Sequence, residues 1–295
     1  MQKRVFGLSS GLLLGACVPL AAFGQGGGDN DNGDNGNNGS NGGGERVELD
    51  EAAVIVEINA TDGDIGFHSL LDADAWKEAR IYSPDGTLLF QEQAKGSLAD
   101  QGLTENAFES DEPLCAPDEE EPDAEVVPLS DFVDRFEAGT YRFTGRTLDN
   151  EGLEGTAEMT YDLPAAPEIL GFDGTTVTWQ PGTDLGRCQD DGLVSNGTIP
   201  DPGGVDVVAW EVVVEPADDE AVDPLRVFSV QLPADAPNTV TVPAEFISAY
   251  EAEDVAEFKV EIGAIESSGN RTFSEEEFEL GGEEETEGEP EDIGG

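Results

Sequence analysis

The chain has 295 residues, and its 66 Asp and Glu residues against 13 Lys and Arg give a formal net charge of -53 at pH 7. Such a charge repels phosphate backbones and anionic lipid headgroups, so we expect neither nucleic acid nor a bare membrane surface as a partner. The acidic residues are spread over predicted loops, strand faces and both termini, which is typical of general solvation in organisms that live in salty water.

The N-terminal segment has the features of a secretory signal peptide, which we expect to span residues 1–24. Two basic residues precede an apolar run over residues 5–22 that only Gly, Ser and Pro interrupt. Two processing routes are open: cleavage after Gly24, which ends a small-x-small sequence, or lipidation of Cys17, whose L-G-A-C sequence resembles a bacterial lipobox. The residues after Cys17 stay apolar, which favours simple secretion. We expect a secreted, periplasmic or cell-surface bacterial protein, or an outer-membrane lipoprotein if Cys17 is lipidated.

Two segments are expected to be disordered because they carry almost no apolar surface. Residues 25–45 consist almost wholly of Gly, Asn and Asp, and residues 282–295 are rich in Glu without an aromatic side chain. The first is predicted to be a flexible tether and the second an acidic tail. No apolar run after the signal peptide approaches the ~18 residues of a membrane-spanning helix, so no span is expected.

Residues 46–164 are predicted to form a first β-sandwich of the immunoglobulin-like kind. Apolar and polar residues alternate in V-I-V-E-I, in the hairpin A-R-I-Y-S-P-D-G-T-L-L-F and in T-Y-R-F-T-G-R-T-L, a period of two that indicates half-buried strands. Tyr141, which follows A-G-T, stands where such a sandwich would place a tyrosine whose hydroxyl bonds to the backbone shortly before it. No family motif is identified in this part of the chain.

Residues 165–281 are predicted to form a second β-sandwich of seven short strands. In A-W-E-V-V-V-E-P, alternate residues are expected to face a core and water, with Val208, Trp210, Val212 and Val214 inside and Glu211 and Glu215 outside. The alternation recurs in the neighbouring segments, and no helical pattern of useful length interrupts them. The overall prediction is therefore an all-β protein of two tandem sandwiches, joined by a short stiff linker at L-P-A-A-P-E-I.

Residues 167–280 resemble the fibronectin type III family. The resemblance rests on Trp179 in the second strand, Trp210 in the third, the F-x-V-x-I-x-A run that starts at Phe258, and the Gly and Ser-Glu that follow it. The family usually has Tyr where this chain has Phe258, so the hydrogen bond of that hydroxyl must be absent or replaced. A long insert over residues 182–206 is a second departure. The resemblance implies contacts with a protein or polysaccharide through loops and sheet edges.

Cys115 and Cys188 are the two cysteines outside the signal segment, and both lie in predicted polar loops. In an oxidising compartment such a pair is expected to be bonded, although unpaired or intermolecular thiols are an alternative. A disulfide would tie the acidic loop of the first sandwich to the insert of the second. Closing a loop of this length contributes on the order of 4 kcal/mol to stability.

The candidate chemical sites are few. His68 is the only histidine in the chain and lies in a predicted strand, so we interpret it as a surface or packing residue and expect no His-based metal cluster. Four carboxylates near predicted turns, which suit a Ca²⁺ ion as hard oxygen ligands, are the candidate metal ligands: Asp62, Asp64, Asp72 and Asp74. No catalytic residue and no cofactor other than Ca²⁺ is predicted.

These observations predict an exported, non-catalytic binding or structural protein acting in adhesion, or in envelope or matrix interactions. Two alternatives are a calcium-dependent adhesive module and an accessory or hydrolytic protein with an acidic site in the first domain. Converging carboxylates of raised pKa in a pocket would favour the hydrolytic alternative.

Overall fold

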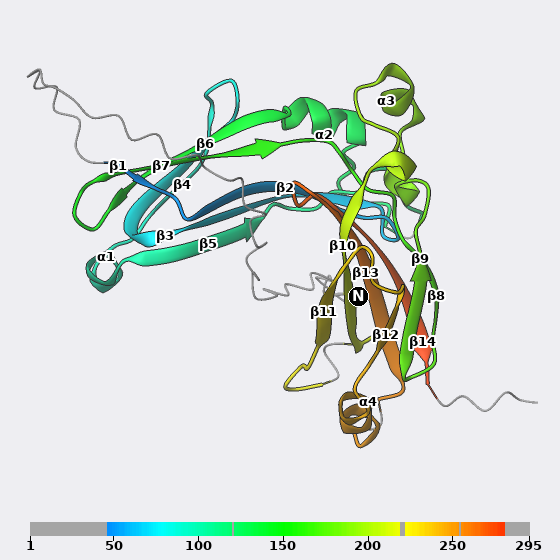
Figure 1. Cartoon of the computed structure of the whole chain (residues 1–295). Helices are drawn as coiled ribbons and strands as arrows, with labels where there is room; N and C mark the ends of the chain where they lie inside the picture. The colour runs from blue at the N-terminus through cyan, green and yellow to red at the C-terminus, as the bar shows by residue number, and fades with distance from the viewer. Residues whose placement is uncertain (1–45, 120, 219–221, 254, 281–295) are drawn as a thin grey trace, which may run out of the picture. The chain divides into compact units, whose positions relative to one another are not determined.

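The computed structural model describes residues 46–119, 121–218, 222–253 and 255–280. The predicted signal peptide, Cys17, the tether and the acidic tail lie outside these residues. The all-β class is confirmed, because the described strands form two sheets and the helices are short (Figure 1). None of the described helices combines the length and the apolar character needed to cross a membrane.

The larger sheet has eleven strands, and it runs in the order β1-β7-β6-β3-β2-β14-β13-β10-β11, with β4 and β5 also paired to β3. Its strands are β1 (Arg46–Glu48), β2 (Glu51–Asn59), β3 (Asp64–Tyr82), β4 (Leu88–Gln93), β5 (Leu103–Glu109), β6 (Gly139–Thr147), β7 (Gly152–Met159), β10 (Val207–Pro216), β11 (Phe228–Pro233), β13 (Glu257–Glu266) and β14 (Arg271–Glu279). The smaller sheet has the order β12-β9-β8 and consists of β8 (Glu168–Phe172), β9 (Thr176–Gln180) and β12 (Thr239–Thr241).

The helices are short and connect strands. They are α1 (Ser97–Gln101), α2 (Leu129–Arg135), α3 (Asp191–Asn196), α4 (Ala244–Glu251) and two 3-10 turns, η1 (Gly186–Cys188) and η2 (Pro202–Gly204). Helix α3 is capped at its N-terminus by Asp190, whose carboxylate accepts two backbone N–H groups of the first turn, and at its C-terminus by Gly197 in the left-handed conformation.

The second sandwich contains the seven predicted strands, β8 to β14. The small sheet packs against β10, β11, β13 and β14 over one apolar core. Trp179 and Trp210 meet edge to face in this core, with their rings 6.2 Å apart, and both are buried. Phe258 is also fully buried there. The alternation of side chains therefore identifies these strands and their inner faces correctly.

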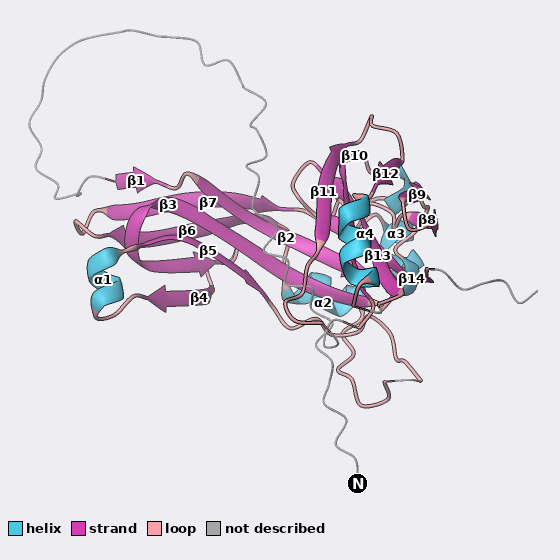
Figure 2. Cartoon of the chain, turned by 90° about the horizontal axis from the view of Figure 1, so that it is seen from below, coloured by secondary structure: helices cyan, strands magenta, loops and turns pink. Residues whose placement is uncertain are grey.

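Two details of the second sandwich differ from the sequence prediction. Val208 is 39% exposed rather than buried, because the pairing of β10 with β13 shifts register between Val207 and Ala209. Helix α4 follows β12, although no helix was expected; Ile247 and Tyr250, three residues apart, bury one face of it. In Figure 2 this helix lies beside β11, in agreement with a ring contact of 6.2 Å between Phe246 and Phe228.

The hydroxyl that Phe258 lacks is supplied from α4. The Tyr250 ring packs edge-on against Phe258 at 5.7 Å, and its hydroxyl accepts the backbone N–H of Arg226 at 2.8 Å. The same hydroxyl donates to the carbonyl of Arg226. In the first sandwich Tyr141 occupies the expected place, and its hydroxyl donates to the carbonyl of Glu137 at 3.1 Å.

The first sandwich is built around the long strand β3, which changes partners near Trp76. Its first half pairs with β2 and β5, its second half with β6 and β4, and the register shifts on both sides of Trp76. The two halves therefore belong to opposite layers, and Trp76 and Tyr141 are fully buried in the core between them.

The segment expected to be a linker and the insert over residues 182–206 both contribute side chains to the first core. From the insert over residues 182–206, Leu185, Cys188 and Ile199 are buried against it, and Leu163 of the expected linker is buried as well. The insert therefore belongs to the packing of the first sandwich, although its neighbours in sequence belong to the second.

The two sandwiches share the large sheet where β14 pairs in parallel with β2, placing Arg271 opposite Glu57 and Phe273 opposite Asn59. Asn270, which is fully buried, reinforces this junction: its Oδ1 accepts the N–H of Val56 at 2.9 Å, and its Nδ2 donates to the carbonyl of Thr160 at 3.1 Å.

Candidate functional site

The face of the large sheet that lies opposite the cores carries a group of charged side chains at the junction of the two sandwiches. Strand β2 buries Val56 and Ile58 in the first core, so the alternation directs Glu57 to this other face. The same alternation directs Glu211 and Glu215 there from β10. The site therefore takes residues from strands that lie far apart in the sequence.

Glu211 and Glu215 do not face water as predicted, since they are only 8% and 5% exposed. Other side chains on the same face cover them. Lys259 lies 3.0 Å from Glu215, and Phe273 lies over Gly263, where a Cβ would stand 2.5 Å from the ring. The alternation of side chains along a strand determines which face of the sheet a residue occupies, but it does not determine how much of that face is exposed to solvent.

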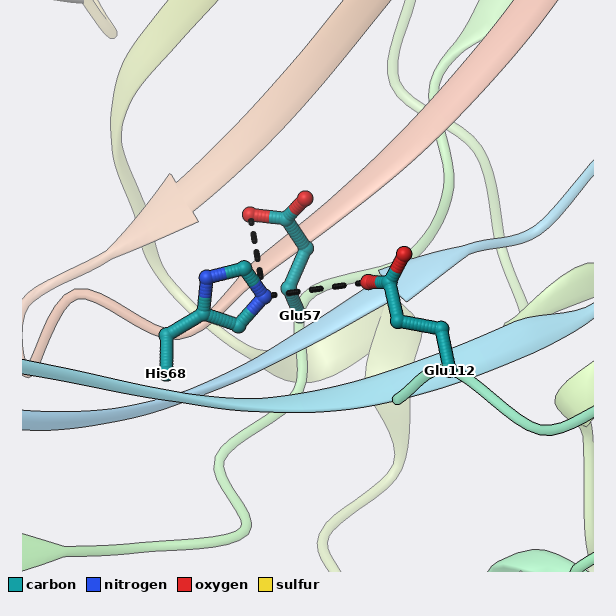
Figure 3. A group of neighbouring side chains, drawn as sticks. All are labelled: Glu57, His68 and Glu112. Carbon is teal, nitrogen blue, oxygen red and sulfur yellow. Dashed lines mark ion pairs between the residues drawn. The ribbon is translucent and has the colours of Figure 1, made fainter. Parts of the chain in front are cut away.

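Glu57, His68 and Glu112 form the centre of this charged group (Figure 3). The imidazole of His68 points its Nε2 between the two carboxylates, 3.9 Å from Glu57 Oε2 and 3.8 Å from Glu112 Oε1. One donor atom from each residue lies within 4.8 Å of the other two. This Glu57–His68–Glu112 cluster can hold a cation or share a proton.

Backbone hydrogen bonds position Glu112, which lies outside the regular strands. The segment after β5 continues beside β3: the N–H of Ser110 donates to the carbonyl of Phe67 at 2.9 Å, and that of Ile65 to the carbonyl of Pro113 at 3.2 Å. Gly66 lies beneath the Glu112 side chain. A Cβ at Gly66 would lie 2.7 Å from Glu112 Oε1, so a side chain at this position would displace the Glu112 carboxylate from its place beside His68.

Burial is the largest influence on the pKa of His68 and lowers it, but Glu112, Glu57 and Glu109 together raise the pKa above its ordinary value. Burial also raises the pKa of Glu57, against the opposing effects of His68 and Arg271. The pKa of Glu109, directly across from His68 on β5, is raised to about 7 by burial and by Glu112. Burial is therefore the largest influence on the pKa of all three groups, and the neighbouring charges modify it.

A second group of charges, around Lys259, lies on the same face. The Lys259 ammonium is 2.7 Å from Glu261 and 3.8 Å from Glu275. Burial followed by the charge of Asp62 raises the pKa of Glu275 to about 7. Asn59 donates to both Asp62, at 3.0 Å, and Glu275, at 3.3 Å. The charged and polar groups around Lys259 are therefore paired with one another by ion pairs and hydrogen bonds within the chain.

The four carboxylates predicted to bind Ca²⁺ do not converge on one point. Asp64 opens β3 and lies near Asp62, and burial, Glu112 and Asp62 raise the pKa of Asp64 to about 8. Asp72 and Asp74 lie eight and ten residues further along the same extended strand, and a rise of about 3.3 Å per residue places them more than roughly 25 Å away. One ion cannot contact both pairs.

The other residues singled out from the sequence are placed as follows. Cys115 and Cys188 form a disulfide with a Cα–Cα distance of 5.0 Å. The four expected core residues are all buried: Trp179, Trp210, Phe258 and Tyr141.

The sequence predicted His68 to be a surface or packing residue, and it singled out neither Glu57 nor Glu112. Glu57 and Lys259 each stand on the polar face of an alternating strand, and a charged residue inside a strand of this kind was the available signal. No local pattern indicates that Glu112 folds over Gly66 or that β14 brings Arg271 beside Glu57. Those contacts depend on pairings between distant segments.

No protein-family model and no curated protein matches the chain. Among solved structures it is similar to a tetra-tandem repeat from the extending region of a large adhesion protein, with 10% identity over 78% of this chain and 49% of that one, at a TM-score of 0.22. A bacterial ice-binding adhesin of 1.5 MDa matches with 12% identity, 80% and 64% coverage and a TM-score of 0.22. The fibronectin(III)-like modules of Clostridium thermocellum CbhA match with 8% identity, 77% and 90% coverage and a TM-score of 0.23.

The chain spans less than two thirds of the length of the two adhesin structures. At these identities and TM-scores the matches identify neither a family nor a function.

Proposed function

We propose that the chain is an exported, non-catalytic binding protein whose two β-sandwiches contact a protein or polysaccharide as one rigid unit. The observation that carries this proposal is the double connection between the parts: β14 pairs with β2 in the shared sheet, and the Cys115–Cys188 disulfide fastens the insert to the loop of the first sandwich. A disulfide of this kind also supports export, because such bonds persist in oxidising compartments.

Rigidity favours binding because a preorganised surface loses less conformational freedom when it meets a partner. The junction has the features of a fixed contact rather than of a hinge. Asn270 is fully buried and bonds to Val56 of β2 and to Thr160 after β7. A hinge would need exposed or exchangeable contacts at this place.

The hydrolytic alternative is supported in one respect, because carboxylates of raised pKa gather near the cluster, with Asp64 at about 8 and Glu109 at about 7. The geometry of the cluster favours a non-catalytic role. A glycosidase keeps about 5 Å or more between its two carboxyl groups free for the sugar, whereas the imidazole of His68 occupies the space between Glu57 and Glu112. Both described cysteines are bonded to each other and so are not thiolate nucleophiles.

A binding assay with the full chain tests the proposal. Fluorescently labelled protein is incubated with envelope material of the producing bacterium, and fractionated polysaccharide or protein competes for the bound label. We expect saturable binding that one of the two fractions abolishes.

The Cys115→Ala/Cys188→Ala variant releases the insert over residues 182–206 from the loop of the first sandwich, so its binding should be several-fold weaker. Signal no higher than for an unrelated acidic protein, or release of sugar or peptide from the envelope material by the chain, would overturn the proposal.

A further inference from the structure

We propose that Glu57, His68 and Glu112 form a binding site for one divalent transition-metal ion, such as Zn²⁺. The ligand atoms are Nε2 of the imidazole and one oxygen of each carboxylate. The site goes beyond the proposed binding function and does not depend on it.

The first argument is the state of the imidazole. Nε2 of His68 is buried, and among the described residues it has no hydrogen-bond partner. Its distances to Glu57 Oε2 and Glu112 Oε1, 3.9 and 3.8 Å, are too long for hydrogen bonds. A buried ring nitrogen aimed between two carboxylates is costly when nothing satisfies it, and a metal ion satisfies all three groups together.

The second argument is the spacing of the three atoms. Ligand atoms that surround a tetrahedral ion at about 2.1 Å lie about 3.4 Å from one another. The two distances from Nε2, 3.9 and 3.8 Å, need to shorten by about 0.5 Å, and the two carboxylate oxygens, which lie within 4.8 Å of each other, must also approach by rotation of the Glu side chains. The three side chains keep 18–25% of their surfaces accessible, so an ion has access to the cluster from solvent.

The third argument is charge and ligand chemistry. Glu109 lies beside His68 and adds a further carboxylate, while Arg271, whose Nε is 3.3 Å from Glu57 Oε2, compensates one charge. The surroundings are therefore acidic enough to attract a divalent ion. A nitrogen ligand combined with two carboxylates favours Zn²⁺ or a related transition ion over Ca²⁺ and Mg²⁺, which prefer oxygen ligands alone.

The fourth argument is Gly66, which lies directly under the cluster. A Cβ there would stand 2.7 Å from Glu112 Oε1 and 3.1 Å from His68 Nε2, so it would occupy the space in which the two donor groups approach each other. The backbone of Gly66 does not need a positive φ, and the absence of a side chain therefore serves the cluster rather than a turn.

Because His68 is the only histidine, nitrogen NMR of the full chain labelled with ¹⁵N-histidine reports on this site alone. Zn²⁺ is titrated into chelator-treated protein, and the Nε2 resonance is expected to shift and to saturate at one equivalent. Glu112→Gln removes a ligand and should weaken binding by at least the roughly 10–100-fold that loss of an outer partner of a ligand costs, and Gly66→Ala should also weaken it. Glu105→Gln is the matched control, because it removes an exposed charge from the same strand as Glu109 and should leave the titration unchanged.

An Nε2 resonance that does not move with Zn²⁺ in the wild-type chain overturns the proposal even if the variants fail to fold. Equal weakening by Glu105→Gln and Glu112→Gln also overturns it, because binding would then be diffuse attraction to an acidic surface. If Ca²⁺ produces the same shift at the same concentration, the assignment to a transition metal fails.

Discussion

Removing the Cys115–Cys188 disulfide should destabilise the protein by about 4 kcal/mol. The bond joins residues separated by 73 positions, and closing a loop of that length lowers the entropy of the unfolded chain by an amount worth about 4 kcal/mol at 25 °C. Both cysteines are buried in the first core, at 7% and 2% exposure, so the folded state can keep its packing after reduction. For a protein of this size the loss corresponds to a fall of roughly 10 °C in Tm.

The assay is urea unfolding of the oxidised and the reduced wild-type chain, followed by tryptophan fluorescence. Trp76 reports the first core, and Trp179 and Trp210 report the second. We expect one transition for both cores, because the shared sheet and Asn270 couple them, and a midpoint that moves to lower urea on reduction. The Cys115→Ala/Cys188→Ala variant should match the reduced chain to within the cost of the two missing sulfur atoms. A loss below about 1 kcal/mol would refute the reasoning from loop closure.

Three further predictions concern single side chains. Asn270→Ala should cost about 3 kcal/mol, because it leaves the buried N–H of Val56 without its acceptor, and hydrogen exchange at Val56 should accelerate well beyond that of other β2 amides. Glu275→Gln should stabilise the protein by about 2 kcal/mol above pH 7 and by little near pH 4. A difference in urea midpoint between variant and wild type that is the same at both pH values would contradict this. Phe258→Ala should cost about 4 kcal/mol in urea unfolding, because its ring is fully buried among aromatic side chains, and a loss near 1 kcal/mol would show that the core collapses around the gap.

The sign of the pH effect at Glu275 follows from its pKa, which is raised from the ordinary 4.5 to about 7 in the folded chain. The folded state holds this proton more tightly than the unfolded state does. The contribution of Glu275 to stability therefore falls as pH rises from about 4.5 to 7 and is constant above that range, and glutamine removes this penalty. Lys259 keeps Glu215 and Glu261 as partners in the variant, so the substitution leaves no buried ammonium unpaired.

Much of the second sandwich could be predicted from the sequence because strand patterns are local. The seven strands from β8 to β14 each alternate over a few residues, and Trp179, Trp210 and Phe258 lie on the inner faces that the alternation indicates. Helix α4 could also have been found, since Pro243 precedes it and Ile247 and Tyr250 are spaced by three. The exposed Val208 could not, because a register shift arises from the pairing with β13 and leaves no mark in the pattern.

The amino-acid sequence by itself determined the all-β class, the strands of the second sandwich and the choice of Cys115 and Cys188 as a pair, because each depends on neighbouring residues or on residue type alone. Only the tertiary structure decided that β14 pairs with β2, that Glu211 is buried and that Glu112 lies against His68. The physical reason is that alternation assigns a side chain to a face, whereas burial, charge and ligand geometry on that face depend on which distant strands and loops come to lie beside it.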